Sequence, residues 1–459
     1  MKLKKAVFSS IRQNDLPKTS SMTEKTFSET LQYLYTFLPM YQRQGPVAFK
    51  KGLGNIQELC WALEQPQWKF KSIHIAGTNG KGSVSAMLNS VLMEAGYKTG
   101  MYTSPHLLSF TERMRVNGKE ISQKEVVEFV EKTQPMIERM KPSFFELTVA
   151  MAFDFFAREE VDIAVIEVGL GGRLDSTNII HPELSVITNI SYDHTDLLGN
   201  TLGLIAEEKA GIIKRFTPVI IGEKHPETTA IFKEKAKLME APVFWAEDMF
   251  EVNNTHTTEK GMAMNVTDKE EEDDSLSFEV DQRGDYQQKN LVTTLAALKV
   301  LNEEGWEISD KAIRNGLSKT TSNSRLAGRM QILATKPTTI CDTGHNEGGI
   351  RLVIEQLNKM EKNHLHFVLG MVSDKDHDKI LALLPKDATY YFVKPNVPRG
   401  LDASILSKKA EAHGLKGETF DRVTDGVIAA RKNAGSEDLI FIGGSTFVVA
   451  DALEPVTVG

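Results

Sequence analysis

Short runs of apolar residues alternate with segments of helical periodicity through the first half of the chain. The apolar runs lie at 73–76, 161–168, 184–190 and 218–222, and residues 97–103 also look like a strand. Between them, apolar positions recur at helical spacing at 84–92, 146–157 and 202–213. Strands that are buried on both faces read as continuous apolar runs. The alternation therefore predicts a mostly parallel sheet with helices on both faces.

The pattern changes after residue 243. Residues 243–280 are polar and rich in turn formers, and they carry an acidic run at 270–274. We expect this run at the solvated tip of a hairpin, within a small β insertion. Helical periodicity returns at 287–304 and at 308–317, and the stretch 319–324 then has the composition of a linker.

Beyond this stretch the alternation restarts, with short apolar strands at 338–341, 366–369, 390–393 and 439–442. A chain of 459 residues is also longer than one hydrophobic core usually serves. We therefore expect an α/β protein with two domains. The first is a P-loop-type domain over 23–322, and the second is a smaller Rossmann-like domain over 323–459. Residues 1–22 are expected to form a loosely ordered arm.

A glycine-rich turn, Gly77 to Ser83, joins the first apolar run to the first helix and reads Gly-Thr-Asn-Gly-Lys-Gly-Ser. In a strand–turn–helix unit of this kind, backbone N–H groups and the helix N-terminus bind phosphates. Lys81 would reach the outer phosphates, and the Ser83 hydroxyl would contact Mg²⁺. The usual P-loop has glycine where this chain has Ile75 and Ser or Thr where it has Gly82. The turn thus predicts a variant nucleotide site, and a plain glycine turn is the alternative.

Polar side chains follow two other apolar strands. Glu167 lies at the end of the strand at 161–168, where a buried carboxylate is costly unless it meets a cation or a hydrogen-bond network. Beside a phosphate loop the natural partner is Mg²⁺, although the residue could instead cap a helix. Asp193 and His194 follow the strand at 184–190. The pair could orient an imidazole toward a metal or substrate, or it could bond only within its loop.

Three further candidates are less distinctive. Lys209 lies in an amphipathic helix and by itself reads as a surface lysine. Arg329 follows the linker stretch, from which it could cross a cleft to a phosphate or simply belong to the linker. Residues 342–346 follow a strand directly and offer groups suited to ribose, phosphate or amino-acid contacts.

Composition excludes several classes of protein. The chain has 62 acidic and 54 basic residues, a net charge of −8, which gives no electrostatic reason to expect nucleic acid or an anionic membrane as partner. Cys60 and Cys341 lie far apart, in no metal-binding or redox spacing. No apolar run has the length of a membrane span, and none follows the basic residues 1–5 as in a signal peptide. We expect a cytoplasmic enzyme.

Together these segments resemble the folylpolyglutamate synthase and dihydrofolate synthase family, within the Mur-ligase-like amide ligases. The resemblance covers about residues 25–455. It rests on motifs that occur in the family's order, at Gly77–Ser83, Thr103–Leu107, Glu112-Arg113 with Val116–Gly118, Glu167–Asn178, Asp193-His194, Glu208–Ile212, Gly328-Arg329 and Asp342–Asn346.

The resemblance assigns roles to individual residues. The metal ligands it implies for Mg²⁺ are Ser83, Glu167, His194 and Lys209, the last as a carbamylated lysine that bridges the metal. The ATP contacts it implies are Gly77, Thr78, Asn79, Gly80, Lys81, Gly82 and Ser83, with Asn290 at the adenine and Arg329 and Asp342 from the second domain. The catalytic group it implies is Lys81, Glu167, His194, Lys209 and Arg329.

The resemblance also implies substrate contacts. Those expected at the pterin–benzoate portion are Thr103, Ser104, Pro105, His106, Arg173 and Asp175. Those expected near the incoming glutamate are His345 and Ser445.

The reaction that the resemblance implies uses ATP and two Mg²⁺ ions. A substrate carboxylate attacks the γ-phosphate, and the amine of L-glutamate then displaces phosphate from the acyl phosphate. The segment 171–175, Gly-Gly-Arg-Leu-Asp, is similar to bifunctional bacterial members. We therefore expect a monomer that adds glutamate both to dihydropteroate, forming dihydrofolate, and to the γ-carboxylate of tetrahydrofolate.

Three segments depart from the family pattern. Tyr286 and Leu291 stand in the adenine segment where histidine and alanine are usual, Leu326-Ala327 replaces Trp-Pro, and Glu347 replaces proline.

Other functions stay open as alternatives. A monofunctional folylpolyglutamate synthase would share all of the motifs. A Mur-type cell-wall ligase should lack the Ser-Pro-His and Gly-Leu-Gly-Gly segments, and a nucleotide-dependent switch would not need the second-domain loop.

Overall fold

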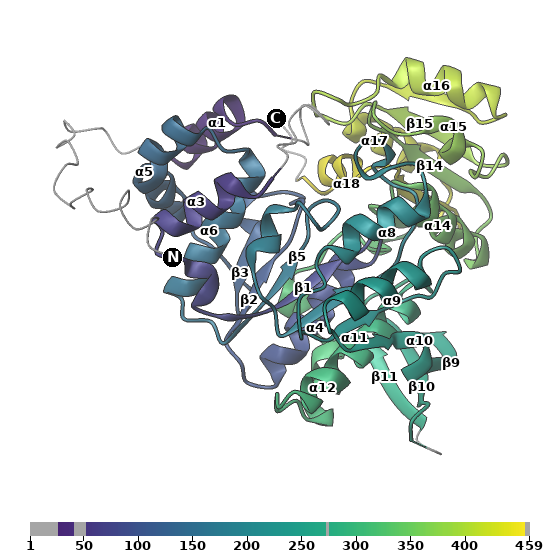
Figure 1. The fold of residues 1–459 in the computed structure, drawn as a ribbon. Helices are drawn as coiled ribbons and strands as arrows, with labels where there is room; N and C mark the ends of the chain where they lie inside the picture. The colour runs from purple at the N-terminus through teal and green to yellow at the C-terminus, as the bar shows by residue number, and fades with distance from the viewer. Residues whose placement is uncertain (1–25, 41–51, 272–274, 455–459) are drawn as a thin grey trace, which may run out of the picture.

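The computed structural model describes residues 26–40, 52–271 and 275–454, which form two α/β units and a small antiparallel sheet (Figure 1). The expected arm at 1–22 lies outside the described residues, as do 272–274 of the acidic run. Within the described part of the chain, no helix combines the length and the apolar character that crossing a membrane requires.

The first sheet has eight strands in the order β4-β3-β2-β5-β1-β6-β7-β8, and it is parallel from β2 to β8. β3 and β4 extend one edge antiparallel to β2. The strand bounds are β1 (Lys71–Ala76), β2 (Thr99–Tyr102), β3 (Met114–Val116), β4 (Lys119–Glu120), β5 (Ile163–Glu167), β6 (Leu184–Ile187), β7 (Val219–Ile221) and β8 (Val243–Trp245).

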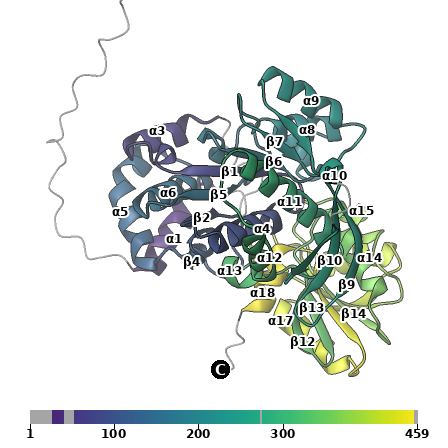
Figure 2. The ribbon, with the colours of Figure 1, turned by 90° about the horizontal axis from the view of Figure 1, so that it is seen from below.

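Helices cover both faces of this sheet, which confirms the architecture expected from the continuous apolar strands (Figure 2). One face packs against α4 (Lys81–Glu94), α10 (Ala246–Met249), α11 (Gln287–Glu303) and α12 (Asp310–Ser318). The other face packs against α1 (Phe27–Phe37), α3 (Gly54–Ala62), α5 (Gln123–Met140), α6 (Phe144–Arg158), α8 (Leu202–Ala210) and α9 (Thr229–Leu238). Short helical turns are η2 (Pro66–Trp68), η3 (Phe110–Arg113), η4 (Ser176–Ile179) and α7 (Thr195–Leu198).

Helix starts follow from local capping. Ser122 and Ser143 accept a hydrogen bond from the third residue of α5 and α6, and the Glu side chain at that position bonds back to the cap. Such a capping box satisfies two N–H groups that a helix end otherwise leaves without partners. Strand β5, which follows α6, is covered on both sides, since every one of its residues is buried.

The expected β insertion is a three-stranded antiparallel sheet in the order β11-β10-β9. Its strands are β9 (Phe250–Thr257), β10 (Met262–Asp268) and β11 (Ser275–Val280). Alternate residues of β10 are buried, among them Met264 and Val266, and they join the core around α4 and α11. The connection after β10 begins with Lys269 to Glu271, so the acidic run lies between two strands as expected.

The second α/β unit has a six-stranded sheet in the order β12-β13-β17-β14-β15-β16, parallel except for β12. The strands are β12 (Gln331–Thr335), β13 (Thr338–Cys341), β14 (Leu365–Leu369), β15 (Thr389–Val393), β16 (Lys416–Phe420) and β17 (Leu439–Gly443). The helices are α14 (Glu347–Lys359), α15 (His377–Leu381), α16 (Ala403–Ala412), α17 (Val423–Asn433) and α18 (Thr446–Leu453). The sequence analysis did not predict the edge strands β12 and β16. No residue of β12 is fully buried, and β16 is largely exposed.

The expectation of a linker at 319–324 is wrong. Residues Thr320–Ser324 form helix α13, and Thr320 and Ser324 are buried. The Ser324 hydroxyl donates to the Ala86 carbonyl oxygen of α4 at 2.9 Å and accepts from Asn89 at 3.1 Å. Polar side chains in this segment are thus explained by hydrogen bonds to the neighbouring helix. Since the expected boundary at 322/323 falls within α13, we propose that the first domain ends after Ser324.

Candidate active site

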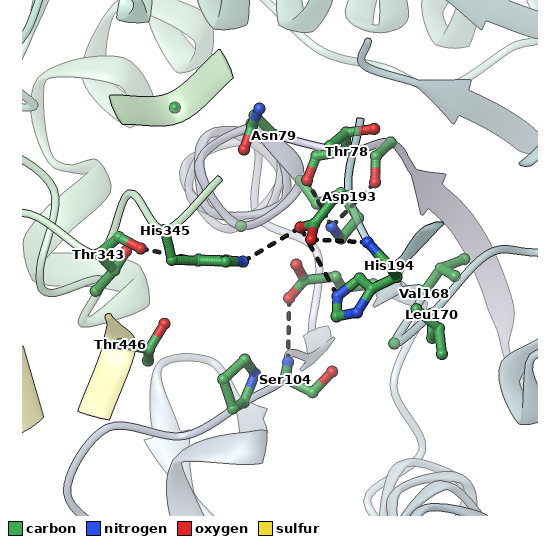
Figure 3. A pocket seen from close by; sticks show the side chains of 18 of the residues that line it. Thr78, Asn79, Ser104, Val168, Leu170, Asp193, His194, Thr343, His345 and Thr446 are labelled. Atoms are coloured by element: carbon green, nitrogen blue, oxygen red, sulfur yellow. Dashed lines mark hydrogen bonds and ion pairs between the residues drawn. The ribbon is translucent and has the colours of Figure 1, made fainter. Parts of the chain in front are cut away.

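The ends of strands from both α/β units line one cavity of about 330 Å³ (Figure 3). The first unit contributes the loops that follow β1, β5 and β6, and the second contributes the loops that follow β13, β14 and β17. The carboxyl ends of parallel strands are where open α/β sheets place their ligands. A ligand in this cavity would contact both units at once.

The glycine-rich turn is packed so closely that side chains are excluded at two positions. Gly77 and Gly80 have φ angles of 149° and 84°, and a Cβ on them would lie 1.8 Å from Thr188 Oγ1 and 2.4 Å from Asn290 Oδ1. Thr188 donates its hydroxyl hydrogen to the Asn79 carbonyl oxygen. The turn is therefore held against the end of β6, with the N-terminus of α4 behind it. This is the geometry of an anion site formed by backbone N–H groups.

Lys81 is the first residue of α4, and its side chain folds back over this turn. Its Nζ donates to the carbonyl oxygens of Gly77 and Thr78 at 3.0 and 3.1 Å. These two hydrogen bonds hold the ammonium group at the mouth of the turn, and neither of them involves a carboxylate. Its charge is available to an anion bound there.

Glu167 and Ser83 offer oxygen ligands beside the turn. Glu167 ends β5 and is 5% exposed, and its Oε2 accepts from the Ser104 N–H at 3.1 Å. Burial raises the pKa of Glu167, while Lys81 and the bond from Ser104 oppose the rise. Ser83 is buried, and its hydroxyl accepts a long 3.4 Å hydrogen bond from Gln287 Nε2. A carboxylate and a hydroxyl beside a phosphate site fit the preference of Mg²⁺ for hard oxygen ligands.

Asp193 is the centre of a second polar cluster, which joins the two units. Its Oδ2 lies 3.3 Å from His345 Nε2 and 3.7 Å from His194 Nε2, and Lys375 donates to its Oδ1 (Figure 3). Although burial opposes the charge, His194, His345 and Lys375 hold the pKa of Asp193 well below its usual value. Among the described residues, Asp193, His194 and His345 are the group whose ligand atoms lie close enough together to hold a metal ion.

Lys209 and His194 are both kept toward their neutral forms. Lys209 is 4% exposed, and burial together with Lys81 lowers its pKa to about 7. Burial lowers the pKa of His194 to about 3, against the pull of Asp193. A neutral amine is a nucleophile, and a neutral imidazole has a lone pair for a metal. The position of Lys209 in an amphipathic helix did not indicate that its side chain is buried.

Asn79 and Asn346 connect the glycine-rich turn to the second unit. Asn79 Nδ2 donates to Asn346 Oδ1 at 3.2 Å, and Asn346 Nδ2 donates back to Asn79 Oδ1 at 3.0 Å. Asn346 also donates to Asp193 Oδ2 at 3.1 Å and caps α14 through the Gly349 N–H. The two loops therefore form one hydrogen-bonded wall of the cavity.

The sequence matches two family models, described as the Mur ligase middle domain over residues 75–298 and the Mur ligase glutamate ligase domain over 328–446. It is 33% identical over 413 residues to the dihydrofolate synthase/folylpolyglutamate synthase of Bacillus subtilis, with 88% of this chain and 94% of the relative covered. The chain belongs to the dihydrofolate synthase/folylpolyglutamate synthase family. This family consists of Mur-ligase-type ATP-dependent ligases, so the resemblance stated from the sequence is confirmed.

Relatives of both kinds in this family are equally similar to the chain. The dihydrofolate synthase/folylpolyglutamate synthase of Escherichia coli is 34% identical, with 83% of this chain and 86% of the relative covered. The folylpolyglutamate synthase of Lacticaseibacillus casei is 32% identical, with 82% and 87% covered. Identity alone therefore does not distinguish a bifunctional from a monofunctional member.

Solved structures of family members have the same fold. The Escherichia coli FolC structure in complex with DHPP and ADP has a TM-score of 0.79 and 32% identity, covering 94% of this chain and 97% of that chain. The Mycobacterium tuberculosis folylpolyglutamate synthase structure complexed with ADP and AMPPCP has a TM-score of 0.82 and 30% identity, covering 93% and 97%. The expected two-part α/β architecture is thereby confirmed.

Most residues singled out by the family resemblance line the cavity. These are Gly77, Thr78, Asn79, Gly80, Lys81, Gly82, Ser83, Ser104, Pro105, Glu167, Asp175, His194, Lys209, Asn290, Arg329, Asp342, His345 and Ser445. Asp175 uses its carboxylate within its own loop, where it accepts from the N–H groups of Leu170 and Thr177. The Asp175 carboxylate therefore stabilises the conformation of its own loop.

Three of the expected substrate contacts are not brought to the cavity lining: Thr103, His106 and Arg173. Arg173 has a side chain that is 58% exposed and pairs with Glu208 at 2.7 Å. His106 is turned toward Arg113, whose Nε donates to its Nδ1 at 2.8 Å. Arg113 itself lines the cavity, so the buried guanidinium is the member of this pair that a ligand could meet.

The sequence analysis missed other lining residues, among them Lys375 and Tyr286, which is a partner of Asp342. It also missed the contact between Asn346 and Asn79. Lys375 lies in a polar segment after β14, Ser373 to Asp376, that carries no helical or strand pattern. The one available signal was that this segment follows an apolar strand, as the loops at Glu167 and Asp342 do. Residues after every parallel strand merit attention for that reason.

Proposed function

We propose that this protein joins L-glutamate to the carboxyl group of dihydropteroate, forming dihydrofolate, and to the γ-carboxyl group of tetrahydrofolate. Each reaction would convert ATP to ADP and phosphate. The observation that carries the proposal is the single cavity in which the glycine-rich turn meets the second-unit loop through Asn79 and Asn346. An amide ligase of this kind must bring a nucleotide, an acid and an amino acid together in one site.

ATP would bind with its phosphates on the turn Gly77–Ser83. Lys81 and Arg329 supply positive charge there, since both lie near enough to Glu167 to lower its pKa. Asn290 would face the base, and Asp342 would hold the nucleotide from the second unit. Relatives solved with ADP, AMPPCP or AMPPNP support a nucleotide in this site.

The divalent ion would be Mg²⁺, and we propose two of them, held by Ser83, Glu167, His194 and a carbamylated Lys209. When bound, the ions neutralise charge on the phosphates and on the acid substrate. The proposal for Lys209 rests on its burial and on a pKa of about 7, because only a neutral amine can react with carbon dioxide. A bifunctional relative solved with Mn, AMPPNP and L-glutamate supports a divalent ion.

The first step is attack of a carboxylate oxygen of the acid on the γ-phosphorus of ATP. The bond from that phosphorus to the β–γ bridging oxygen breaks, which gives an acyl phosphate and ADP. Lys81 and Arg329 stabilise the charge that moves onto the β-phosphate of the leaving ADP. In the second step the glutamate amine attacks the acyl carbon, loses a proton and displaces inorganic phosphate. Placement of His345 and Ser445 in the second-unit wall supports their assignment to glutamate.

The acid substrate would lie against the apolar part of the cavity. This part consists of Met40, Phe144, Phe145, Leu170, Leu174 and Leu198. Apolar and aromatic side chains suit a flat heteroaromatic ring and a benzoate spacer. We propose that the protein acts as a monomer, and that it does so in the cytoplasm, where ATP and folates are available.

The test is release of phosphate from ATP that depends on glutamate, with dihydropteroate and tetrahydrofolate assayed separately. Release with both acids is the expected result and supports the bifunctional enzyme. Release with tetrahydrofolate alone would reduce the activity to that of a folylpolyglutamate synthase. Absence of release with either acid would contradict the proposal.

A further inference from the structure

Tyr286 connects the two α/β units at the edge of the cavity. It immediately precedes α11 of the first unit, yet its ring packs against the core of the second, beside Met330. Its hydroxyl donates to Asp342 Oδ2 at 2.7 Å. Asp342 is 4% exposed, and both residues line the cavity. One hydroxyl group thus links a first-unit helix to a second-unit carboxylate at the candidate nucleotide site.

The Asp342 carboxylate is oriented by three donors. Besides Tyr286, its Oδ2 accepts from the Met330 N–H at 2.9 Å, and its Oδ1 accepts from the Gly344 N–H at 2.7 Å. A carboxylate can accept about four hydrogen bonds, so capacity for one further donor remains. The two backbone donors belong to the second unit itself. Tyr286 is therefore the donor through which the first unit fixes this carboxylate.

The turn that carries Tyr286 is itself attached to the second unit. The Asp285 N–H donates to Gln356 Oε1 at 2.9 Å, and Lys359 forms an ion pair with the Asp285 carboxylate. Gln356 and Lys359 both belong to α14, the helix that Asn346 caps. The contacts of Asp285 with α14 and of Tyr286 with Asp342 together fix the position of the Tyr286 hydroxyl. A hydrogen bond with a defined orientation requires such support.

We propose that the Tyr286 hydroxyl is a positioning group for the nucleotide, which holds Asp342 where its remaining acceptor capacity meets a hydroxyl group of the ATP ribose. This inference rests on the proposed function, in which Asp342 contacts ATP. It assigns Tyr286 to nucleotide affinity, separately from the glutamate and pterin contacts elsewhere in the cavity. Loss of the hydroxyl should weaken ATP binding and leave the other two substrates unaffected.

The pKa of Tyr286 supports a hydroxyl group that remains a hydrogen-bond donor. Burial and the Asp342 charge keep the pKa of Tyr286 well above its usual value, so the phenol stays protonated at neutral and moderately alkaline pH. The groups that face it are Asp342, Arg329 and Cys341. The effect of removing the hydroxyl should therefore be the same at pH 7 and at pH 9.

The experiment compares Tyr286→Phe with Tyr390→Phe. Tyr390 is a fully buried tyrosine of the second sheet, outside the cavity, and its hydroxyl donates to the Pro385 carbonyl oxygen at 2.6 Å. Both variants lose one buried hydroxyl, but only one loses a bond to Asp342. Michaelis constants for ATP and glutamate, kcat, equilibrium ATP binding and thermal midpoints are measured for each.

For Tyr286→Phe we expect about a tenfold rise in the Michaelis and dissociation constants for ATP, as for loss of a hydrogen bond to a charged group. The Michaelis constant for glutamate should change less than about twofold. Tyr390→Phe should lower the thermal midpoint without changing any substrate constant. An unchanged ATP constant in Tyr286→Phe, or an equal rise in Tyr390→Phe, would overturn the inference.

A surface variant covers the case in which Tyr286→Phe is too unstable to assay. Lys359→Ala removes the ion pair to Asp285 from an exposed position and should raise the ATP dissociation constant two- to threefold, whereas no change would count against the inference. Binding data also separate the two proposals. If the wild-type protein releases no phosphate but Tyr286→Phe still weakens ATP binding, the proposed function fails and the role of Tyr286 stands.

Discussion

The two walls of the cavity are built in different ways. The phosphate-binding part of the first-unit wall is mainly backbone, since Gly77 and Gly80 leave no room for side chains and Lys81 is the charged group that folds over them. The second-unit wall consists of side chains that are oriented by distant partners. Asn346 bonds to Asn79, 267 positions away, and Lys375 bonds to Asp193, 182 positions away. Phosphate recognition is thus encoded locally, whereas the second wall exists only when both units are in contact.

The largest expected effect is in the first wall. Lys81→Met keeps the length of the side chain and removes its charge, which should lower kcat for glutamate-dependent phosphate release by about 10³-fold, as for loss of a charge-stabilising donor. The thermal midpoint should change little, because the Nζ bonds only to two carbonyl oxygens of its own turn. A kcat within tenfold of the wild-type value would show that Lys81 does not take part in the reaction.

The next effect concerns stability at the junction of the walls. Lys375 and Asp193 have side chains that are 12% and 9% exposed. Removing one partner of a buried pair is costly, so Lys375→Met should reduce the free energy of unfolding by about 3 kcal/mol. The double variant with Asp193→Asn should recover much of this loss, because it leaves no buried charge alone. Denaturant titration measures both values.

The matched control is Lys379→Met, which removes a lysine from an exposed pair with Asp376. Exposed pairs contribute little, so we expect no measurable change in its unfolding midpoint. If Lys375→Met is no less stable than this control, the contact between Lys375 and Asp193 is not holding the walls together.

A smaller, pH-dependent effect is expected at Lys209. The pKa of Lys209 is about 7 in the folded protein and 10.5 for an unperturbed lysine, so between these values the unfolded state binds the extra proton. Stability of the metal-free protein in bicarbonate-free buffer should therefore rise with pH over this window. The slope contributed by Lys209 approaches about 1.4 kcal/mol per pH unit.

The measurement is the free energy of unfolding of the wild type and of Lys209→Met between pH 7 and pH 10. Because the variant has no titrating group at this position, the difference should move in favour of the wild type as pH rises. Parallel profiles for the two proteins would show that Lys209 is not buried as a neutral amine.

The smallest effect is expected at Arg173. The family resemblance assigns it to the pterin–benzoate portion, but its exposed side chain pairs with Glu208 outside the cavity lining. Arg173→Ala should therefore change the Michaelis constant for dihydropteroate less than about twofold. A tenfold rise would instead support the role that the sequence assigns, and would mean that the loop at 171–175 moves when substrate binds.

Much of the fold followed from the sequence, because strands buried on both faces must be apolar along their length. The phosphate turn was equally readable, since its glycines, Lys81 and Ser83 lie in one short segment between an apolar strand and a helix. Helix α13 was misread as a linker because its polar residues bond to α4, a contact that composition does not record. The partnerships of Lys375 and Tyr286 were missed for the same reason, since each depends on a residue of the other unit.

The most direct test of the central claim follows oxygen atoms through the reaction. Dihydropteroate labelled with ¹⁸O in its carboxyl group is incubated with the protein, ATP and glutamate, and the released phosphate is examined by mass spectrometry. An acyl phosphate formed in the shared cavity predicts that one labelled oxygen per turnover appears in the phosphate. Amide formation with unlabelled phosphate would contradict the account, because the acid would then not have been phosphorylated.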